Sequence, residues 1–203
     1  MKLLLAAFLA MLVLATTAGA ATAPRPARYA LRAAQVGKGF FPVIVGGGST
    51  LKRPTLDICH ESLPSEKLRL SRFTIGFVHS QTDPAISNEI VIYKPGGAAQ
   101  AMRDVVKAVK ACPKGPVTVG AVSVTTRITP LHPKGTFLPG ALAYGYHQYG
   151  TISGHTVSQY ALIVYQRLGD VLSSVVAHDS TLAKRLVLGG HAAVQSARNL
   201  RVR

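Results

Sequence analysis

The clearest hydrophobic pattern in the chain is a helical one that ends on a cysteine. From Ala98 to Cys112, apolar residues recur at spacings of four, three, four and three, and the basic residues fall away from this stripe. The pattern predicts a helix from residue 97 or 98 to about residue 111, ended by Pro113. It also predicts that Cys112 faces the body of the domain.

Apolar runs before this helix predict strands. Residues 89–94 are apolar on both faces, which is typical of a central strand covered on both sides. Residues 68–79 predict a long strand, and a change of parity among its apolar residues indicates a β-bulge near Ser71-Arg72. A short edge strand is expected at 40–45.

The second half of the chain predicts more strands. Residues 117–128 are rich in Val and Thr and predict one strand with a change of parity between Ala121 and Val122. Two strands are expected at 142–149 and 156–167, joined across residues 150–155. Gly169-Asp170 then signals a tight hairpin into a last strand at 171–178.

Two further helices are predicted near the ends of the domain. One spans residues 27–36, with Gly37 as its C-cap. The other follows Asp179 or Ser180 as its N-cap, and glycines at 189–190 weaken its middle, where we expect close backbone packing. These elements together predict a single α+β domain, an antiparallel β-sheet with packed helices.

Residues 1–23 have the pattern of a secretory signal peptide. Lys2 precedes a long unbroken apolar run, and small residues suit cleavage after Ala20, with Ala23 as the alternative. A proline directly follows the second site and should hinder cleavage there. An uncleaved membrane anchor is the other interpretation, but the apolar run is shorter than the roughly 20 residues needed to span a bilayer. We therefore expect residues 24–203 to form a secreted, extracellular domain.

The composition indicates a buried hydrophobic core, and the two cysteines indicate a covalent cross-link. The chain is 48% hydrophobic and 15% charged, so it can bury a core and is not disordered. Cys59 and Cys112 are the only cysteines, and two cysteines in an exported chain indicate one disulfide. A pair of buried thiols is the alternative. The bond would close a loop of roughly 53 residues and hold the segment around Cys59 against the core.

The charge of the chain favours anionic partners. The chain has 23 Lys and Arg against 8 Asp and Glu, a net charge of +15. Cleavage of the signal peptide would remove only one of these charged residues, Lys2. Such a charge suits a cell-wall polymer, anionic lipid headgroups or nucleic acid. However, the basic residues are scattered, and no run of five and no nucleic-acid motif accompanies them. We expect an anionic cell-surface partner or general basicity, rather than nucleic-acid binding.

Two segments together show a family pattern. The segment NEIVIYKPGGAAQAMRDVVKAVKACP is a strand that leads into an Ala-rich helix closed by Cys112, and YQRLGDVLSSVVAHD holds an Arg-x-Gly-polar hairpin before the last strand. In this order the chain resembles the PknH-like extracellular sensor domain over roughly residues 27–200. That domain occurs on mycobacterial serine/threonine kinases and in secreted actinobacterial proteins.

The resemblance implies an α+β domain with an antiparallel sheet, packed helices, and a cleft proposed to bind a ligand of unknown identity. There are departures from the family. No kinase domain is recognisable in this sequence, so no kinase activity is expected. The kinase-attached member has two disulfides, whereas this chain can form only one.

The densest cluster of aromatic and polar residues includes Tyr144, Tyr146 and His147. Tyr144 and Tyr146 share a parity and could line a ligand groove, since aromatic rings with polar tips suit sugars or lipids. An ordinary sheet surface or core lining is the alternative. His147 and His155 would share a face in only one strand register, and a zinc site needs three or four ligands. We therefore expect no metal and no cofactor.

Motifs for catalysis are missing from the sequence. There is no GxSxG motif, and His60-Glu61 begins an HExxH motif that has no second histidine and that Pro64 would interrupt. The eight acidic residues are dispersed, and nothing marks a pair of them as catalytic.

The leading hypothesis is a secreted, monomeric, non-catalytic binding module of sensor type. Its ligand would be an unknown small molecule or envelope component, anionic or lipid-like. A small secreted hydrolase and a basic, envelope-associated interaction protein are the alternatives. A cleft with an apolar floor and a basic rim would favour the first hypothesis, and a carboxylate that meets a Ser-His pair would favour the second.

Overall fold

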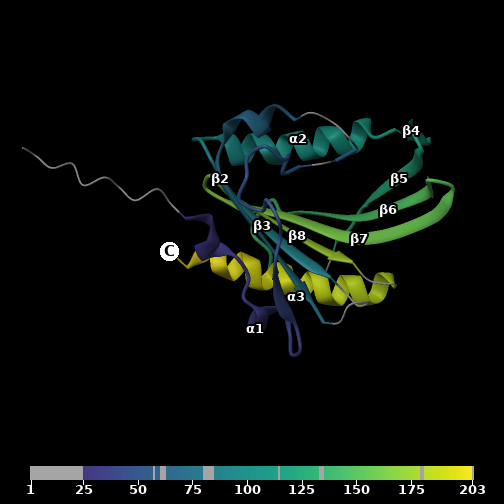
Figure 1. Ribbon diagram of the computed structural model, residues 1–203. Helices are drawn as coiled ribbons and strands as arrows, with labels where there is room; N and C mark the ends of the chain where they lie inside the picture. Colours follow the sequence, from purple (N-terminus) through teal and green to yellow (C-terminus); the bar gives the residue numbers. More distant parts are fainter. Residues whose placement is uncertain are drawn as a thin grey trace, which may run out of the picture.

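The computed structural model describes residues 25–56, 58–59, 63–79, 85–113, 115–132, 135–178 and 181–202, so the predicted leader lies outside the described residues. The described chain forms an eight-stranded antiparallel sheet with one long helix on each face (Figure 1). The strand order is β1-β2-β3-β8-β7-β6-β5-β4. The strands are β1 (Phe41–Ile44), β2 (Arg69–Val78), β3 (Ile86–Tyr93), β4 (Val117–Val119), β5 (Val122–Pro130), β6 (Leu142–Ile152), β7 (His155–Leu168) and β8 (Val171–His178).

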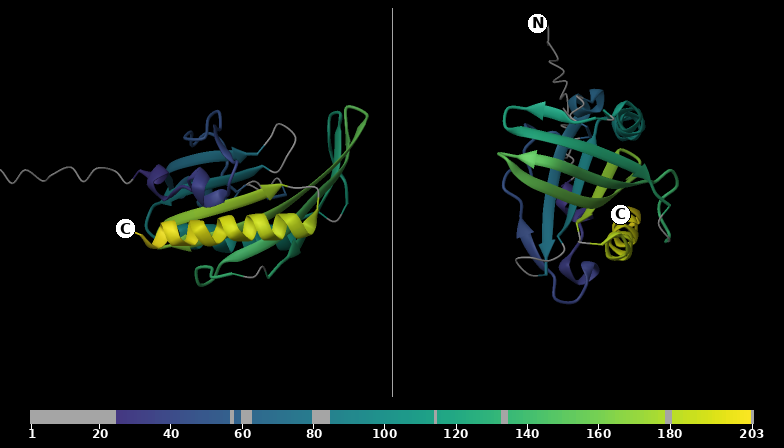
Figure 2. Two further views of the ribbon diagram at one scale, coloured as in Figure 1. Left: turned by 90° about the horizontal axis from the view of Figure 1, so that it is seen from below. Right: turned by 90° about the vertical axis from the view of Figure 1, so that its right-hand side faces the viewer.

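The position of β8 is the main feature of this topology. Strands β1 to β3 form one antiparallel group and strands β4 to β7 form another, and β8 pairs with β3 on one side and β7 on the other. The long β6–β7 hairpin extends past the end of α3 in two views (Figures 1 and 2). A single sheet therefore results from two groups of strands joined by the last strand of the chain.

The helices cover the two faces of the sheet. Within the described ranges, no helix is both long and apolar enough to cross a membrane. The long helices are α2 (Gly97–Ala111) and α3 (Leu182–Arg201), and the short ones are α1 (Ala33–Val36) and the 3₁₀ segments η1 (Pro26–Tyr29) and η2 (Pro64–Leu68).

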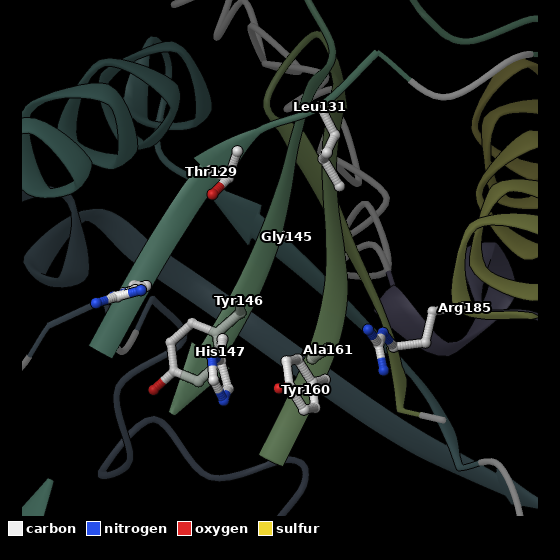
Figure 3. A pocket seen from close by; sticks show the side chains of 9 residues that line it. Thr129, Leu131, Gly145, Tyr146, His147, Tyr160, Ala161 and Arg185 are labelled. Atoms are coloured by element: carbon white, nitrogen blue, oxygen red, sulfur yellow. The ribbon is translucent and has the colours of Figure 1, made fainter. Parts of the chain in front are cut away.

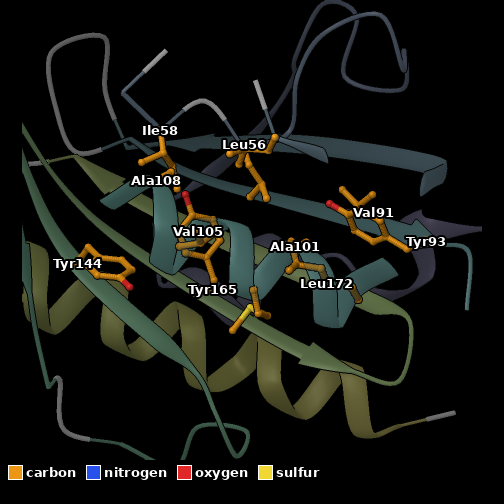
Figure 4. Packing of buried hydrophobic residues seen from close by; sticks show 13 residues of the cluster. Leu56, Ile58, Val91, Tyr93, Ala101, Val105, Ala108, Tyr144, Tyr165 and Leu172 are labelled. Carbon is orange, nitrogen blue, oxygen red and sulfur yellow. The ribbon is translucent and has the colours of Figure 1, made fainter. Parts of the chain in front are cut away.

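One hydrophobic cluster lies between α2 and the sheet (Figure 4). The helix contributes its predicted stripe, in which Ala98 and Val105 are fully buried. Strand β3 is buried along almost its whole length, which confirms the predicted central strand covered on both sides. From the opposite side of the helix, Leu56 and Ile58 complete the cluster.

The other face of the sheet packs against α3 and the N-terminal segments. Gly189 allows the helix to approach closely, since a Cβ added there would lie 2.7 Å from Leu162 Cδ2 and 2.8 Å from the Cβ of Ala177. The predicted close packing at this glycine is therefore confirmed. Ala192, Ala193 and Ala197 are also fully buried along the helix.

The predicted disulfide is present. Cys59 and Cys112 are bonded, with their Cα atoms 5.4 Å apart and a sequence separation of 53 residues. Cys112 is the C-cap of α2. The bond therefore ties the segment that contains Leu56 and Ile58 to the end of the helix over which that segment packs.

The predicted helix over residues 27–36 is wrong in its middle. The chain forms η1 and α1 instead, separated by extended residues around Ala30. The reason is a tertiary contact: the backbone N–H of Leu31 donates to Asn88 Oδ1 at 2.9 Å. The Asn88 amide in turn donates to Ser173 Oγ and to the carbonyl of Ser174. A buried asparagine on β3 thus takes the backbone donor that a continuous helix would use.

The predicted single strand over 117–128 is a hairpin. Strands β4 and β5 pair with each other, with Val117 opposite Val124. Gly120 turns the chain with φ of 59°, a left-handed conformation that glycine adopts at little cost. The change of parity between Ala121 and Val122 therefore marks the end of a turn rather than a bulge.

Two other boundaries differ slightly from the sequence prediction. The register of β2 against β3 shifts between Arg69 and Ser71, at the start of the predicted bulge region. The N-cap of α3 is Thr181, whose hydroxyl accepts a hydrogen bond from the N–H of Lys184 at 3.3 Å. Asp179 and Ser180, the predicted caps, lie outside the described residues.

Candidate functional site

A cavity of about 290 Å³ lies against strands β5, β6 and β7, on the face of the sheet that α3 covers (Figure 3). Much of its lining is apolar or aromatic, and Arg127 of β5 and Arg185 of α3 add two guanidinium groups. Among the described residues that line it, none is acidic. The lining consists of Arg127, Thr129, Leu131, Gly145, Tyr146, His147, Tyr160, Ala161 and Arg185.

Strand register aligns a row of functional groups along the cavity. Arg127 lies opposite His147, and His147 lies opposite Tyr160. Cross-strand partners project to the same face, so the imidazole and phenol rings stack with centroids 3.9 Å apart and planes 9° apart. The Arg185 guanidinium carbon lies 4.7 Å from the centroid of the Tyr160 ring. We call Arg127, His147, Tyr160 and Arg185 the cation–aromatic row.

A tight turn sets this register. Ser153 and Gly154 connect β6 to β7 with φ of 50° and 79°. Two central residues with positive φ are typical of the type I′ turn, which suits the twist of a hairpin. Ile152 therefore lies opposite His155, and counting back along both strands places His147 opposite Tyr160.

Gly145 keeps space open in the cavity. A Cβ added at this position would lie 3.2 Å from Leu131 Cδ1, so a larger side chain would have to displace that leucine. Leu131 itself lines the cavity and packs against the cluster under α3. A small residue on β6 is thus required for the present cavity shape.

The electrostatic environment favours a neutral histidine in the row. Partial burial lowers the pKa of His147, and the positive charges of Arg127 and Arg185 lower it further. His147 is therefore largely uncharged at pH 7. The positive charge of the lining comes from the two arginines rather than from the imidazole.

The structure separates the three residues of the predicted groove. Tyr146 and His147 contribute to the lining of the cavity. Tyr144 is only 7% exposed and packs in the cluster under α2, where burial raises its pKa. Successive side chains of a strand point to opposite faces, so Tyr144 and Tyr146 project to one face of β6 and His147 projects to the other.

Three important lining residues were not predicted from the sequence: Arg127, Tyr160 and Arg185. The Ser153-Gly154 dipeptide is the signal that could have found Tyr160, because a two-residue turn there fixes its pairing with His147. Arg185 reaches the cavity only because α3 packs on this face of the sheet, which no local pattern in the sequence records.

His147 and His155 do not come together to begin a metal site. His147 shares a face of the sheet with its cross-strand partner Tyr160. His155 is five positions from Tyr160 on β7, so its side chain points to the opposite face from that of His147. In the part of the chain that the structure describes, no three His, Cys, Asp or Glu residues are grouped so that they could hold a metal ion.

The fold belongs to the α+β class, with an antiparallel sheet between packed helices. No protein-family model matches the chain, and no curated protein matches it. Among solved structures, the chain is similar to the crystal structure of the extracellular domain of PknH from Mycobacterium tuberculosis, with a TM-score of 0.57 and 13% sequence identity. The alignment covers 88% of this chain and 96% of that chain. At this identity the likeness shows a shared fold.

Proposed function

We propose that the protein is a secreted, non-catalytic domain of sensor type that binds a small anionic amphiphile in the cavity beside the cation–aromatic row. One observation carries the proposal: an apolar cavity bordered by two arginines, with no acidic residue among its described lining residues. Guanidinium groups suit carboxylate, sulfate or phosphate groups, and the rings and aliphatic side chains suit an apolar body.

The size of the cavity supports a small ligand. At about 290 Å³ it lies near the lower end of pockets that hold small molecules. The likeness in fold to an extracellular domain supports the extracellular, sensor-type part of the proposal. The disulfide supports it too, because such bonds persist in oxidising compartments.

Native mass spectrometry of the protein purified from its own culture medium tests the proposal directly. We expect a bound mass that is lost when the protein is denatured. The released compound should combine an acidic group with an apolar body. A protein without any bound mass that also fails to bind anionic amphiphiles would contradict the proposal.

Binding of anilinonaphthalene sulfonate, an aromatic anion, tests the cavity itself. Gly145→Leu should abolish saturable binding because its side chain fills the cavity. Arg127→Gln should weaken binding at least tenfold, because a charged hydrogen bond contributes about 1.5–3 kcal/mol. Arg167→Gln is the matched control, an exposed arginine at the far end of β7. Equal affinities for all variants would place the dye elsewhere and count against this cavity.

A second candidate function is hydrolysis, favoured by one contact. His147 Nε2 lies 3.1 Å from Ser158 Oγ, the separation expected of a base and a serine nucleophile. Among the described residues, no carboxylate lines the adjoining cavity to orient the imidazole. Turnover of ester substrates that is lost in Ser158→Ala but retained in Ser123→Ala would support a hydrolase over a binding domain.

A further inference from the structure

Exposed arginines gather at the end of the molecule where the described chain begins and ends. Arg25 precedes η1 and Arg28 lies within it. Arg167 lies next to the β7–β8 turn, and Arg198 and Arg201 lie in the last turn of α3. All five are exposed. We call this set the terminal basic face: Arg25, Arg28, Arg167, Arg198 and Arg201.

One hydrophobic cluster holds the segments of this face together. Tyr29 of η1, Leu168 of β7 and Leu200 of α3 all belong to it or pack against it. Asn199 Nδ2 also donates to the carbonyl of Ala30 at 3.0 Å, which fixes η1 beside the end of α3. The views in Figures 1 and 2 show the C-terminal end of α3 at this end of the domain.

Local contacts orient these arginines without using all of their donors. Arg167 donates to the carbonyl of Gly169 at 3.4 Å, and Arg201 donates to the carbonyl of Phe137 at 3.3 Å. The Arg28 guanidinium carbon lies 4.5 Å from the centroid of the adjacent tyrosine ring. A guanidinium group has five N–H donors, so each of these side chains can also reach an external oxygen.

Within the described residues, one acidic side chain lies at this face, Asp170 in the β7–β8 turn, against five arginines. Two ion pairs occur among the described residues, Arg69–Glu66 between β2 and η2 and Arg72–Glu89 between β2 and β3, and neither involves an arginine of this face. The Asp170 carboxylate accepts a hydrogen bond from the N–H of Gly96 at 2.7 Å, which holds it toward the start of α2. Five arginines against one aspartate leave the face with an excess of positive charge.

An exposed apolar residue lies within the same face. Val202 follows Arg201 directly and is 76% exposed. Arginines beside an exposed apolar side chain match the interface of an anionic bilayer, which offers phosphate groups above acyl chains. A helix-stabilising role could explain Arg198 and Arg201, because cations favour a helix C-terminus. It does not explain the arginines on the other two segments.

We propose that the terminal basic face docks on an anionic lipid surface, with its arginines at the headgroup phosphates and Val202 at the boundary with the acyl chains. This docking is independent of the cavity. It would place the bilayer at one end of the sheet and leave the β6–β7 hairpin and the cavity directed away from it.

Vesicle binding tests the charge component. The purified protein should bind vesicles of phosphatidylcholine mixed with phosphatidylglycerol and should not bind phosphatidylcholine alone. R28Q/R198Q/R201Q should weaken binding about 100-fold at low salt, since each cation near the surface contributes about 1 kcal/mol. R103Q/K107Q/K110Q removes the same charge from the exposed side of α2 and is the matched control. Equal losses in both triple variants would overturn the proposal.

A tryptophan reporter tests the orientation. The chain has no tryptophan, so Val202→Trp and Val187→Trp each supply a single reporter. The two valines are almost equally exposed, at 76% and 75%. Val202 directly follows α3, whereas Val187 lies in the N-terminal half of the helix. On vesicles that contain phosphatidylglycerol, only the reporter at position 202 should shift to the blue and be quenched by brominated lipid. A shift at position 187 alone, or at neither position, would overturn the proposal.

A soluble polyanion separates a bilayer from an acidic polymer. If polyphosphate binds the terminal basic face as tightly as vesicles do, with no blue shift at position 202 on vesicles, the partner is a polymer and the lipid proposal is overturned. Binding of anilinonaphthalene sulfonate should be unchanged in R28Q/R198Q/R201Q. That result would show that the triple variant is folded. It would also show that the loss of vesicle binding does not come from a change in the cavity.

Discussion

A buried ion pair shows what a single residue contributes to this fold. The Arg72 side chain donates to Glu89 and to the carbonyl of Thr50, the latter at 3.2 Å, and so holds the loop after β1 over the sheet. The two charged side chains are 9% and 11% exposed. Burial raises the pKa of Glu89, although the nearby Arg72 acts in the opposite direction.

We expect the pair to matter more when broken than when replaced. Arg72→Met or Glu89→Leu alone leaves a buried charge without its partner and should lower the free energy of unfolding by about 3–5 kcal/mol. The double variant should lose much less than the sum of the two single variants. Urea denaturation of the four proteins measures this coupling, and additive losses would show that the two side chains act independently.

His147 allows a prediction of pH dependence. Arg127 and Arg185 both lower its pKa, so Arg127→Gln should raise the pKa, with burial still holding it below 6.5. An NMR titration of the imidazole measures this, with His147→Gln to assign the signal. A His147 pKa unchanged in Arg127→Gln would show that the arginine does not act on the ring.

The same lowered pKa has a consequence for stability. Because the folded protein binds a proton at His147 less readily than the unfolded chain does, the unfolded chain takes up more protons as pH falls below about 6.5. The contribution of this group to stability is therefore present at neutral pH and is lost on acidification. In His147→Gln that part of the pH dependence should disappear.

At the scale of elements, the approach of α3 to the sheet depends on one glycine. Gly189→Ala should lower the free energy of unfolding by about 1–3 kcal/mol, because the added methyl group overlaps Leu162 and Ala177. Gly115→Ala is the control, since a Cβ there meets nothing within 4 Å. Thermal or urea denaturation compares them. Equal stability of Gly189→Ala and the parent protein would mean that the helix can move away at little cost.

The disulfide joins two elements that already pack together. Cys59→Ala combined with Cys112→Ala should lower stability by at most about 4 kcal/mol, the chain-entropy value for a loop of 53 residues. Unfolding of the double variant measures the loss. The same decrease should follow reduction of the parent protein. A reductant that destabilises the double variant as strongly as the parent would mean that the effect does not come from this bond.

Local patterns were sufficient for the elements that obey them and failed where tertiary contacts intervene. The helix 97–111 and the central strand were predicted because their apolar spacing matches their burial. The helix 27–36 was interrupted because Asn88, 57 residues from Leu31, takes the Leu31 backbone donor. The hairpin at Gly120 was mistaken for one strand because a parity change has the same sequence signature in a bulge and in a turn.

At the scale of the whole molecule, the candidate site could be predicted only in part. Tyr146 and His147 belong to one local cluster in the sequence, so their selection needed no knowledge of the fold. Arg127 and Arg185 come from other elements and meet His147 through strand register and helix packing. Tyr144 was misleading because its side chain faces the other layer of the domain.

The net charge and the sheet edge together predict a monomer. The edge strand β1 exposes Phe41 and Ile44, which are 63% and 93% accessible, but Pro42 removes one of its backbone donors. Charge repulsion between copies should also oppose pairing at this edge. Sedimentation velocity should therefore show a single monomeric species at low salt. A dimer that is lost in Ile44→Lys would show instead that this edge mediates association.

The central position of β8 also determines how late in synthesis the sheet can be completed. While the chain is being synthesised, strands β1 to β3 and β4 to β7 emerge as two separate groups, each with one apolar edge that lacks its neighbour. They can join only when residues 171–178 follow, and Arg185 can reach the cavity only after that. A protein interrupted just before residue 171 would therefore have seven of its eight strands but neither a continuous sheet nor a binding cavity.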